Sequence, residues 1–219
     1  MTNITSTWEP CTVRVETHTE TGAPLIVEGV PARKRKTTGE VFYDPEDALR
    51  IHYAQLAKKA GLDEPRDFAI MAVLGASAYS FKTPNVPYHY HLNKMLFYQW
   101  QHLDQQGLGN AFPHDEFVAD RKGPVPVNIE EDLERLEKDG LIEPRKWPTG
   151  KQHQPVPVRL SKKGEKVAAT ILGEAEPWIA KTSAQVKTDL ILLSPADLRA
   201  KVHTEYPQYR REYVEIDDA

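Results

Sequence analysis

Long apolar runs and cysteines are both scarce in this 219-residue chain. The best apolar stretch, Phe68 to Phe81, is interrupted by two serines and is shorter than the ~18 residues that a membrane span needs. The first ten residues lack the charged and apolar regions of a signal peptide. We therefore expect a cytoplasmic protein with no membrane partner.

The charge balance and the cysteine count further limit the binding partners and the compartment that the sequence predicts. A net charge of −4 gives no general attraction for nucleic acids or membranes. The single Cys11 cannot form an internal disulfide, which agrees with a reducing compartment. At 24.9 kDa the chain can bury one sizeable core, or one core and a small appendage.

The amino-terminal part has a β pattern. Residues 12–19 alternate with a period of two, residues 20–23 supply a turn, and Pro24–Glu28 returns as the partner strand, so we predict a hairpin. The segment Arg33–Glu40 is interpreted as a polar connection, and Val41–Tyr43 as a further short strand.

Helix signals dominate the rest of the chain. Asp44 as an N-cap and Pro45 at the first helical position predict a helix that runs to about Lys59 and closes at Gly61. Residues 65–80 and 91–106 are apolar around most of their circumference, which predicts buried helices. Additional helices are expected to begin after Asn128, after Ser161, at Pro177 and after Ser194.

These elements predict an α+β fold that is mainly α. Residues 1–62 are expected to form a β-hairpin module with a linking helix, and residues 63–219 a helical domain with carboxy-terminal helices and a tail. Within the second part, a helix from 129 to 139 is followed by strands at 141–143 and 156–160 and by another helix. This is the order of a winged helix, with the two strands as the wing.

The helix after Asn128 is the most regular. Asn128 and Glu131 have capping-box spacing, and the pairs Glu131–Arg135 and Glu134–Lys138 have the favourable i,i+4 order. One apolar face comprises Ile129, Leu133 and Leu136.

The charge of this helix argues against reading DNA. From 129 to 139 it has six acidic and two basic residues, a net charge of −4, which opposes contact with phosphates. The wing loop and its flanks are instead basic: Arg145, Lys146, Lys151, Arg159, Lys162, Lys163 and Lys166. That patch, like Arg33–Lys36, could contact phosphates or an acidic protein, or could be a solvated face.

Metal and catalytic signatures are weak. Tyr88–His91 could place two imidazoles on one face of an extended segment, but no convergent zinc-ligand spacing accompanies it. The segment Gly75–Tyr79 lacks the second glycine of a nucleophile elbow, and the prolines of Gly123–Pro126 remove the N–H groups that a phosphate loop needs. We therefore expect no catalysis, no cofactor and no metal.

Two motifs carry a family resemblance. The first is His91–Tyr98, HLNKMLFY, and the second is the Gly-Pro-Val turn at 123–125, which follows the extended segment from Phe117 and precedes the helix and strand of 129–142. Together they resemble the Panacea domain, the SocA-like antitoxin family, over residues 64–172. The matching residues are Leu92, Lys94, Leu96, Phe97, Tyr98, Gly123, Pro124 and Val125.

The resemblance implies an antitoxin of a type II toxin–antitoxin system, which binds a toxin encoded next to it. In that family reading the motif helix is core with Lys94 at its rim, and the Gly-Pro turn sets the entry angle of the acidic helix. The expected partner-binding residues are Lys94, Tyr98, Arg121, Lys122, Gly123, Pro124, Glu130, Glu134 and Lys151. The first alternative is a winged-helix transcription regulator, and a third, weaker one is an enzyme or metal-dependent protein built around Tyr88–His91, which metal analysis of the purified protein would test. For self-association, the alternative is a homodimer.

The amino-terminal segment Val27–Glu46 looks like the zinc-ribbon module of MqsA-type antitoxins. The Gly39–Glu40 pair is present, but lysine and threonine stand where that module has cysteines, and only Cys11 remains from the first pair. Because four ligands cannot be assembled, we expect no structural zinc. We hypothesise that this module contacts the toxin or mediates dimerisation, which deletion of residues 1–44 would test.

Overall fold

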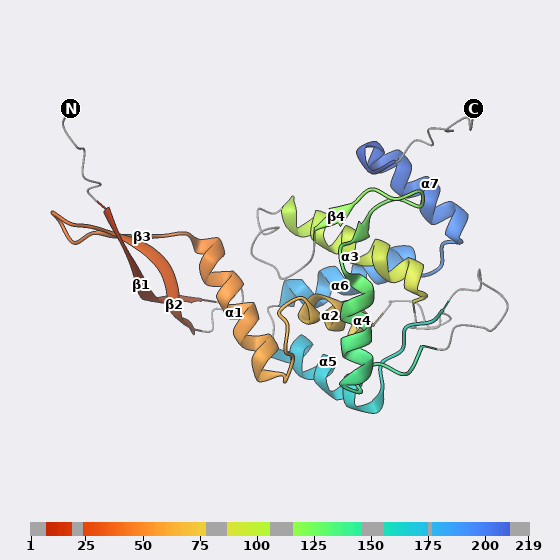
Figure 1. Ribbon diagram of the computed structural model, residues 1–219, viewed down its shortest axis with the longest axis horizontal. Coiled ribbons are helices and arrows are strands. Elements are labelled where there is room, and N and C mark those ends of the chain that lie inside the picture. Colours follow the sequence, from red (N-terminus) through yellow and green to blue (C-terminus); the bar gives the residue numbers. More distant parts are fainter. Residues whose placement is uncertain are drawn as a thin grey trace, which may run out of the picture.

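The computed structural model describes residues 8–18, 24–77, 87–105, 116–145, 156–174 and 177–210. The fold is α+β and mainly α, as the sequence predicts (Figure 1). Its elements are β1 (Trp8–His18), β2 (Pro24–Arg35), β3 (Val41–Tyr43), α1 (Pro45–Lys59), α2 (Asp67–Gly75), α3 (His89–Asp104), β4 (Phe117–Val118), β5 (Val125–Pro126), α4 (Ile129–Lys138), α5 (Lys162–Glu174), α6 (Pro177–Leu190), α7 (Pro195–Glu205) and the 3-10 helix η1 (Pro207–Tyr209).

The strands β1–β3 form an antiparallel sheet in the order β1-β2-β3, which we call the N-terminal module. The antiparallel strands of the predicted hairpin and the short third strand are confirmed, although β1 begins at Trp8 and not at residue 12. The predicted turn, residues 20–23, lies outside the described residues. The interpretation of Arg33–Glu40 as a connection is wrong for its first part, because β2 continues to Arg35. The chain then turns tightly: Arg35 N donates to Glu40 O over 2.8 Å, and Gly39 supplies a φ of +75° in the turn.

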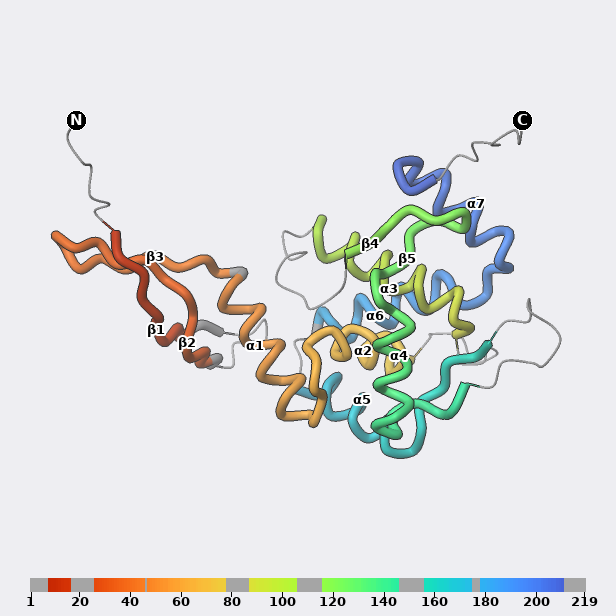
Figure 2. Tube along the Cα trace, viewed as in Figure 1, coloured from red at the N-terminus to blue at the C-terminus, as the bar shows by residue number. Residues whose placement is uncertain are grey.

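Helix α1 joins the module to the rest of the protein (Figures 1 and 2). One side of it adds Ala48 to a small core with Val15, Val27 and Val30 of the sheet. Farther along, Tyr53 and Ala57 belong to the main core. The predicted start at Pro45 and end at Lys59 are confirmed, and Gly61 follows with a φ of +77°.

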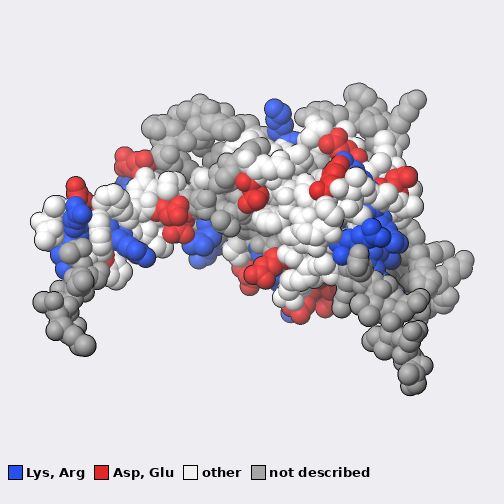
Figure 3. All heavy atoms as spheres, turned by 90° about the horizontal axis from the view of Figure 1, so that it is seen from above, with Lys and Arg blue, Asp and Glu red and all other residues white. Residues whose placement is uncertain are grey.

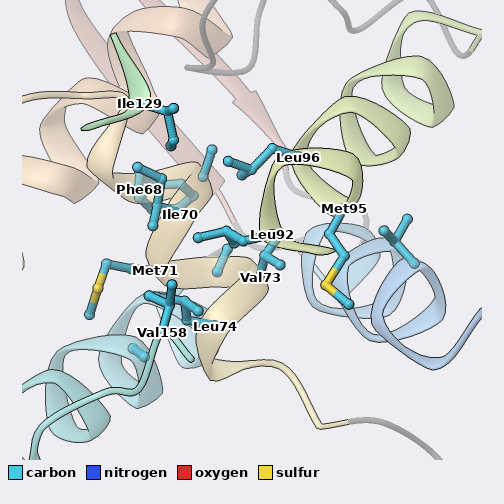
Figure 4. Packing of buried hydrophobic residues seen from close by; sticks show 14 of the residues in the cluster. Phe68, Ile70, Met71, Val73, Leu74, Leu92, Met95, Leu96, Ile129 and Val158 are labelled. Carbon is cyan, nitrogen blue, oxygen red and sulfur yellow. The ribbon is translucent and has the colours of Figure 1, made fainter. Parts of the chain in front are cut away.

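The remaining helices, with β4 and β5, form what we call the helical body. Its core surrounds α2, in which every residue from Asp67 to Leu74 is buried. Side chains from α2 meet Leu92 and Leu96 of α3, Ile129 of α4 and Val158 (Figure 4). The prediction of a buried, apolar helix is therefore confirmed.

The predicted length of this helix is wrong. Helix α2 ends at Gly75, whereas the expected end was residue 80; residues 78–80 lie outside the described residues. Lys187 of α6 caps this end, since its Nζ donates to Leu74 O over 2.7 Å and to Ala76 O over 2.8 Å. A cap from a residue more than a hundred positions away leaves no local signal.

The other helix starts follow the sequence closely. Helix α3 begins two residues before the predicted His91. The Ser161 hydroxyl accepts from Gly164 N over 3.0 Å at the start of α5, and the Ser194 hydroxyl accepts from Asp197 N over 3.2 Å at the start of α7. The proline at the first position of α6 is also confirmed.

The predicted wing is present in reduced form. Its two segments pair only through an antiparallel bridge between Ile142 and Leu160, with Glu143 N donating to Arg159 O over 2.8 Å. Residues 156–158 instead approach α3, where Tyr88 bridges Pro157. The wing loop, residues 146–155, lies outside the described residues.

Candidate functional site

The two motifs of the family resemblance meet inside the helical body. Helix α3 carries Lys94, whose Nζ donates to the carbonyl of Pro124 over 2.6 Å. The prediction that this lysine lies at the rim is wrong, because its side chain is 0% exposed. Burial lowers the pKa of Lys94 to about 7, and the face of Tyr90 lies 5.2 Å from the amine.

The Gly-Pro turn is held between α3 and α7. Gly123 adopts a φ of +90°, and its N–H donates to Asp120 O over 2.9 Å. A Cβ at this position would lie 2.8 Å from Cγ1 of Val202 in α7, so no larger residue fits without movement. Gly123 and Pro124 are buried, and β5 leads from them into α4.

Tyr98 is also an internal residue. Its hydroxyl donates to Glu205 Oε2 over 2.6 Å, and Lys201 pairs with the same carboxylate. Burial raises the pKa of Tyr98, and the hydrogen bond to Glu205 raises it further. Burial alone would raise the pKa of Glu205, but the bonds from Lys201 and Tyr98 outweigh it and lower that pKa. This contact fastens α7 to α3.

The surface above these contacts is cationic. Arg121 and Lys122 are exposed on the β4–β5 turn, and the hydroxyl of Tyr90 donates to Lys122 O over 3.2 Å. Figure 3 shows Lys and Arg side chains gathered on the body, over the region where Figure 1 places α7 and this turn. Of the predicted contact residues in the two motifs and their flank, Arg121 and Lys122 are the two on this surface.

Helix α4 begins differently from the prediction. Asn128 has a φ of 62°, in the left-handed region, and its side chain makes no cap hydrogen bond, so the predicted capping box is wrong. Asparagine tolerates this conformation better than most residues do. The predicted apolar face is confirmed, since Ile129, Leu133 and Leu136 are all buried.

A buried ion network fixes α4 against α2. Arg135 donates to Asp67 over 3.1 and 2.6 Å and to Asp132 over 2.6 Å, and Arg66 also reaches Asp132 over 2.6 Å. Arg135 is therefore directed to these acids of the interior, whereas we predicted a surface pair with Glu131. Burial raises the pKa of Asp67, although the bond from Arg135 opposes the rise.

The acidic side of α4 is partly neutralised. Arg145 donates to Glu130 over 2.8 Å and to Glu137 over 3.3 Å, and its side chain is only 5% exposed. His89 Nε2 lies 3.1 Å from Glu130 Oε1, close enough to pair when the imidazole is protonated. Burial lowers the pKa of His89, and Glu130 opposes that shift. Glu134 remains exposed.

The predicted basic patch is therefore smaller than expected. Arg145 does not belong to it, because it is buried against the two glutamates of α4. Lys146 and Lys151 lie outside the described residues. The exposed members are Arg159, Lys162, Lys163 and Lys166. Lys163 Nζ also donates to Asp139 O over 2.8 Å, at the end of α4.

The histidines of Tyr88–His91 do not converge. The expected extended segment is wrong beyond Tyr88, because α3 begins at His89. His91 Nε2 lies 2.8 Å from Leu193 O, whereas His89 is directed to Glu130. Within the described residues there is no group of three or more His, Cys, Asp or Glu side chains placed to hold a metal ion.

A cavity of about 380 Å³ lies between the end of α2 and the wing. Glu143, Arg159 and Glu165 supply its charged lining, and the other lining residues are Leu74, Gly75, Val158, Leu160 and Ala169. This described lining contains no hydroxyl, thiol or imidazole, and the two carboxylates are its groups that can exchange a proton.

Comparison with known proteins adds no family name: no protein-family model matches the chain, and no curated protein does. In the part of the chain that the structure describes, no helix has both the length and the apolar character of a bilayer-crossing segment.

Proposed function

We propose that the protein is a cytoplasmic antitoxin that neutralises a toxin by direct, non-catalytic protein contact, as its resemblance to the SocA-like family implies. The supporting observation is the buried hydrogen bond from Lys94 Nζ to Pro124 O, 2.6 Å long. It joins two motifs that are thirty residues apart. The two motifs that carry the resemblance are therefore in contact in the fold.

This unit is a framework, and the partner must be bound elsewhere. Lys94, Tyr98, Gly123 and Pro124 are buried, so their roles are structural in this conformation. Arg121, Lys122, Glu130 and Glu134 remain the accessible members of the predicted contact set, while Lys151 lies outside the described residues. Exposed groups of both signs favour recognition of a complementary protein surface over binding of a polyanion.

The test is a growth assay followed by co-purification. The product of the adjacent open reading frame is induced alone and together with the full chain. We expect growth arrest by the product alone, rescue by this protein, and a stable complex of the two. A harmless neighbour that does not co-purify would contradict the proposal. Size measurement of the purified chain decides between a monomer and a homodimer.

A winged-helix regulator is the second candidate. The bridge between Ile142 and Leu160 preserves the order of helix, wing and helix, and Lys162, Lys163 and Lys166 are exposed beside it. This function predicts salt-dependent binding to the protein's own promoter, lost in a Lys162→Glu, Lys163→Glu variant. Unchanged DNA binding in that variant, or none in the wild type, would exclude recognition through the wing.

A further inference from the structure

The edge strand β3 has backbone groups directed away from the sheet. In an antiparallel pair, alternate residues exchange hydrogen bonds with the partner strand and the others direct N–H and C=O outward. The turn-closing bond from Arg35 N to Glu40 O sets this alternation. Phe42 therefore bonds inward to β2, while Val41 and Tyr43 present their backbone groups at the free edge.

The opposite edge of the sheet is protected. By the same alternation Pro10 of β1, which pairs with Arg33, occupies an outward position. Proline has no N–H to offer, and a proline at an outward position is a known way to block further strand pairing. Among the described strands of this sheet, β3 lacks that protection. Its side chains are apolar and exposed: Val41 42%, Phe42 58% and Tyr43 44%.

The neighbourhood of β3 is positively charged. Residues 31–43 contain four bases, Arg33–Lys36, and one acid, Glu40, which gives a net charge of 4 − 1 = +3. Glu40 pairs with Arg35 over 3.1 Å. Within the described residues, the other three bases have no acid within 4.0 Å. Figure 3 shows Lys and Arg side chains on the module, at the left of the view, beside white surface.

We propose that β3 is a docking edge for an extended, acidic segment of a partner protein, which joins the sheet as a fourth strand. Strand addition supplies main-chain hydrogen bonds to Val41 and Tyr43, and the four bases select for acidic side chains. The partner is the toxin, so this inference rests on the proposed function.

Other occupants fit the edge less well. A phosphodiester backbone has no N–H groups for the outward carbonyls of Val41 and Tyr43 and no apolar surface for their side chains. Two copies of β3 meeting edge to edge would bring together two segments of net charge +3, residues 31–43 of each copy, which is unfavourable. A polypeptide with acidic side chains meets both requirements.

A proline substitution tests the edge directly. Val41→Pro removes an outward N–H and leaves the inward bonds of Phe42 in place, whereas Thr12→Pro removes an outward N–H from the β1 edge as a matched control. The full chain and each variant are purified with the adjacent gene product, and their affinities are measured. We expect Val41→Pro to bind roughly tenfold more weakly or worse, and Thr12→Pro to bind like the wild type.

The charge requirement is tested separately. Arg33→Glu combined with Lys36→Glu leaves every backbone group intact and should slow association, with a loss that shrinks as salt is added. Circular dichroism and the urea midpoint of each variant establish that the module is folded. A folded Val41→Pro chain with weakened binding supports the proposal.

Three results would overturn it. If Val41→Pro and Thr12→Pro both bind the product as tightly as the wild type, and the wild type rescues growth, the docking edge is wrong while the antitoxin function stands. If the wild type neither rescues growth nor binds the product, both the antitoxin function and the toxin as the partner of β3 are contradicted. If Val41→Pro turns a dimer into a monomer, or abolishes DNA binding, the edge serves a second copy or a nucleic acid.

Discussion

The N-terminal module and the helical body differ in which side chains they expose and which they bury. In the module, Val15, Val27 and Val30 form a small core with Ala48 of α1, whereas Val41, Phe42 and Tyr43 are exposed. The body buries even Lys94 and Lys187, each against backbone carbonyls. A region that exposes apolar groups is suited to contact a partner, whereas one that buries charged groups is committed to a single packed arrangement.

The largest expected difference between the regions concerns ion pairs. Arg135→Ala leaves Asp67 and Asp132 buried with too little positive charge, so the free energy of unfolding should fall by about 3–5 kcal/mol. Arg14→Ala in the module removes an exposed pair with Glu16 and should cost less than about 1 kcal/mol. Urea denaturation of both variants measures the contrast, and equal losses would contradict it.

A smaller effect is expected at the glycine turn. Gly123→Ala combines left-handed strain with a Cβ 2.8 Å from Val202, and should cost about 2–3 kcal/mol. Gly140→Ala is the matched control, because Gly140 also has a positive φ but nothing within 4 Å of the added Cβ. It should cost only about 1 kcal/mol. If thermal unfolding shows the same loss of stability for both variants, Val202 of α7 does not pack closely against Gly123.

The buried amine of Lys94 should make stability depend on pH. Its pKa is about 7 in the folded protein against a reference value of 10.5, so between these values the unfolded chain binds more protons. The contribution of Lys94 to the free energy of unfolding is therefore fully present above the pKa of the unfolded chain. It is lost as pH falls through the pKa of the folded protein. From about pH 9 to about pH 7, the wild type should lose about 1–2 kcal/mol more than Lys94→Met does.

A surface lysine of the module provides the control for that measurement. Lys34 is exposed, so Lys34→Met should keep the wild-type slope of unfolding free energy against pH. If Lys94→Met also keeps the wild-type slope of unfolding free energy against pH, the Lys94 amine is not desolvated. The body would then not differ from the module in burying this charged group.

The smallest effect on stability is expected at the exposed aromatic of the module. Phe42 contacts Trp8 edge-on with ring centroids 5.0 Å apart, so Phe42→Ser should cost less than about 1 kcal/mol. Leu192→Ser, at an exposed position of the body, should be equally mild. The two should differ in binding the adjacent gene product, which only Phe42→Ser should weaken. A weaker complex with Leu192→Ser would indicate that the partner contacts the helical body instead of the module.

Local signals in the sequence predicted most of the helix starts. Proline at the first position of α1 and α6, serine before α5 and α7, and glycine after α1 all act within a few residues. The alternation of the first hairpin predicted its two strands but not its register, which shifts at a bulge between Val13 and Val15. Such positions could be predicted because the groups they satisfy are their close neighbours in the chain.

The candidate site could not be predicted in the same way. The placements of Lys94, Arg135 and Arg145 depend on contacts 30, 68 and 15 residues away, so surface and interior roles looked alike in the sequence. Asn128 is a residue type that favours helix caps, but its backbone lies in the left-handed region and its side chain makes no cap hydrogen bond. The free edge of β3 did have a signal, three apolar residues after four bases, but its meaning required the strand order.

The most direct test of the account is amide hydrogen exchange on the full chain, alone and in complex with the adjacent gene product. A partner strand on β3 predicts new protection of the amides of Val41 and Tyr43, with no change at Thr12 on the opposite edge or along α3. Protection that appears instead along α4 or around Lys162 and Lys163, with Val41 and Tyr43 unchanged, would contradict the assignment of the module as the partner-binding region.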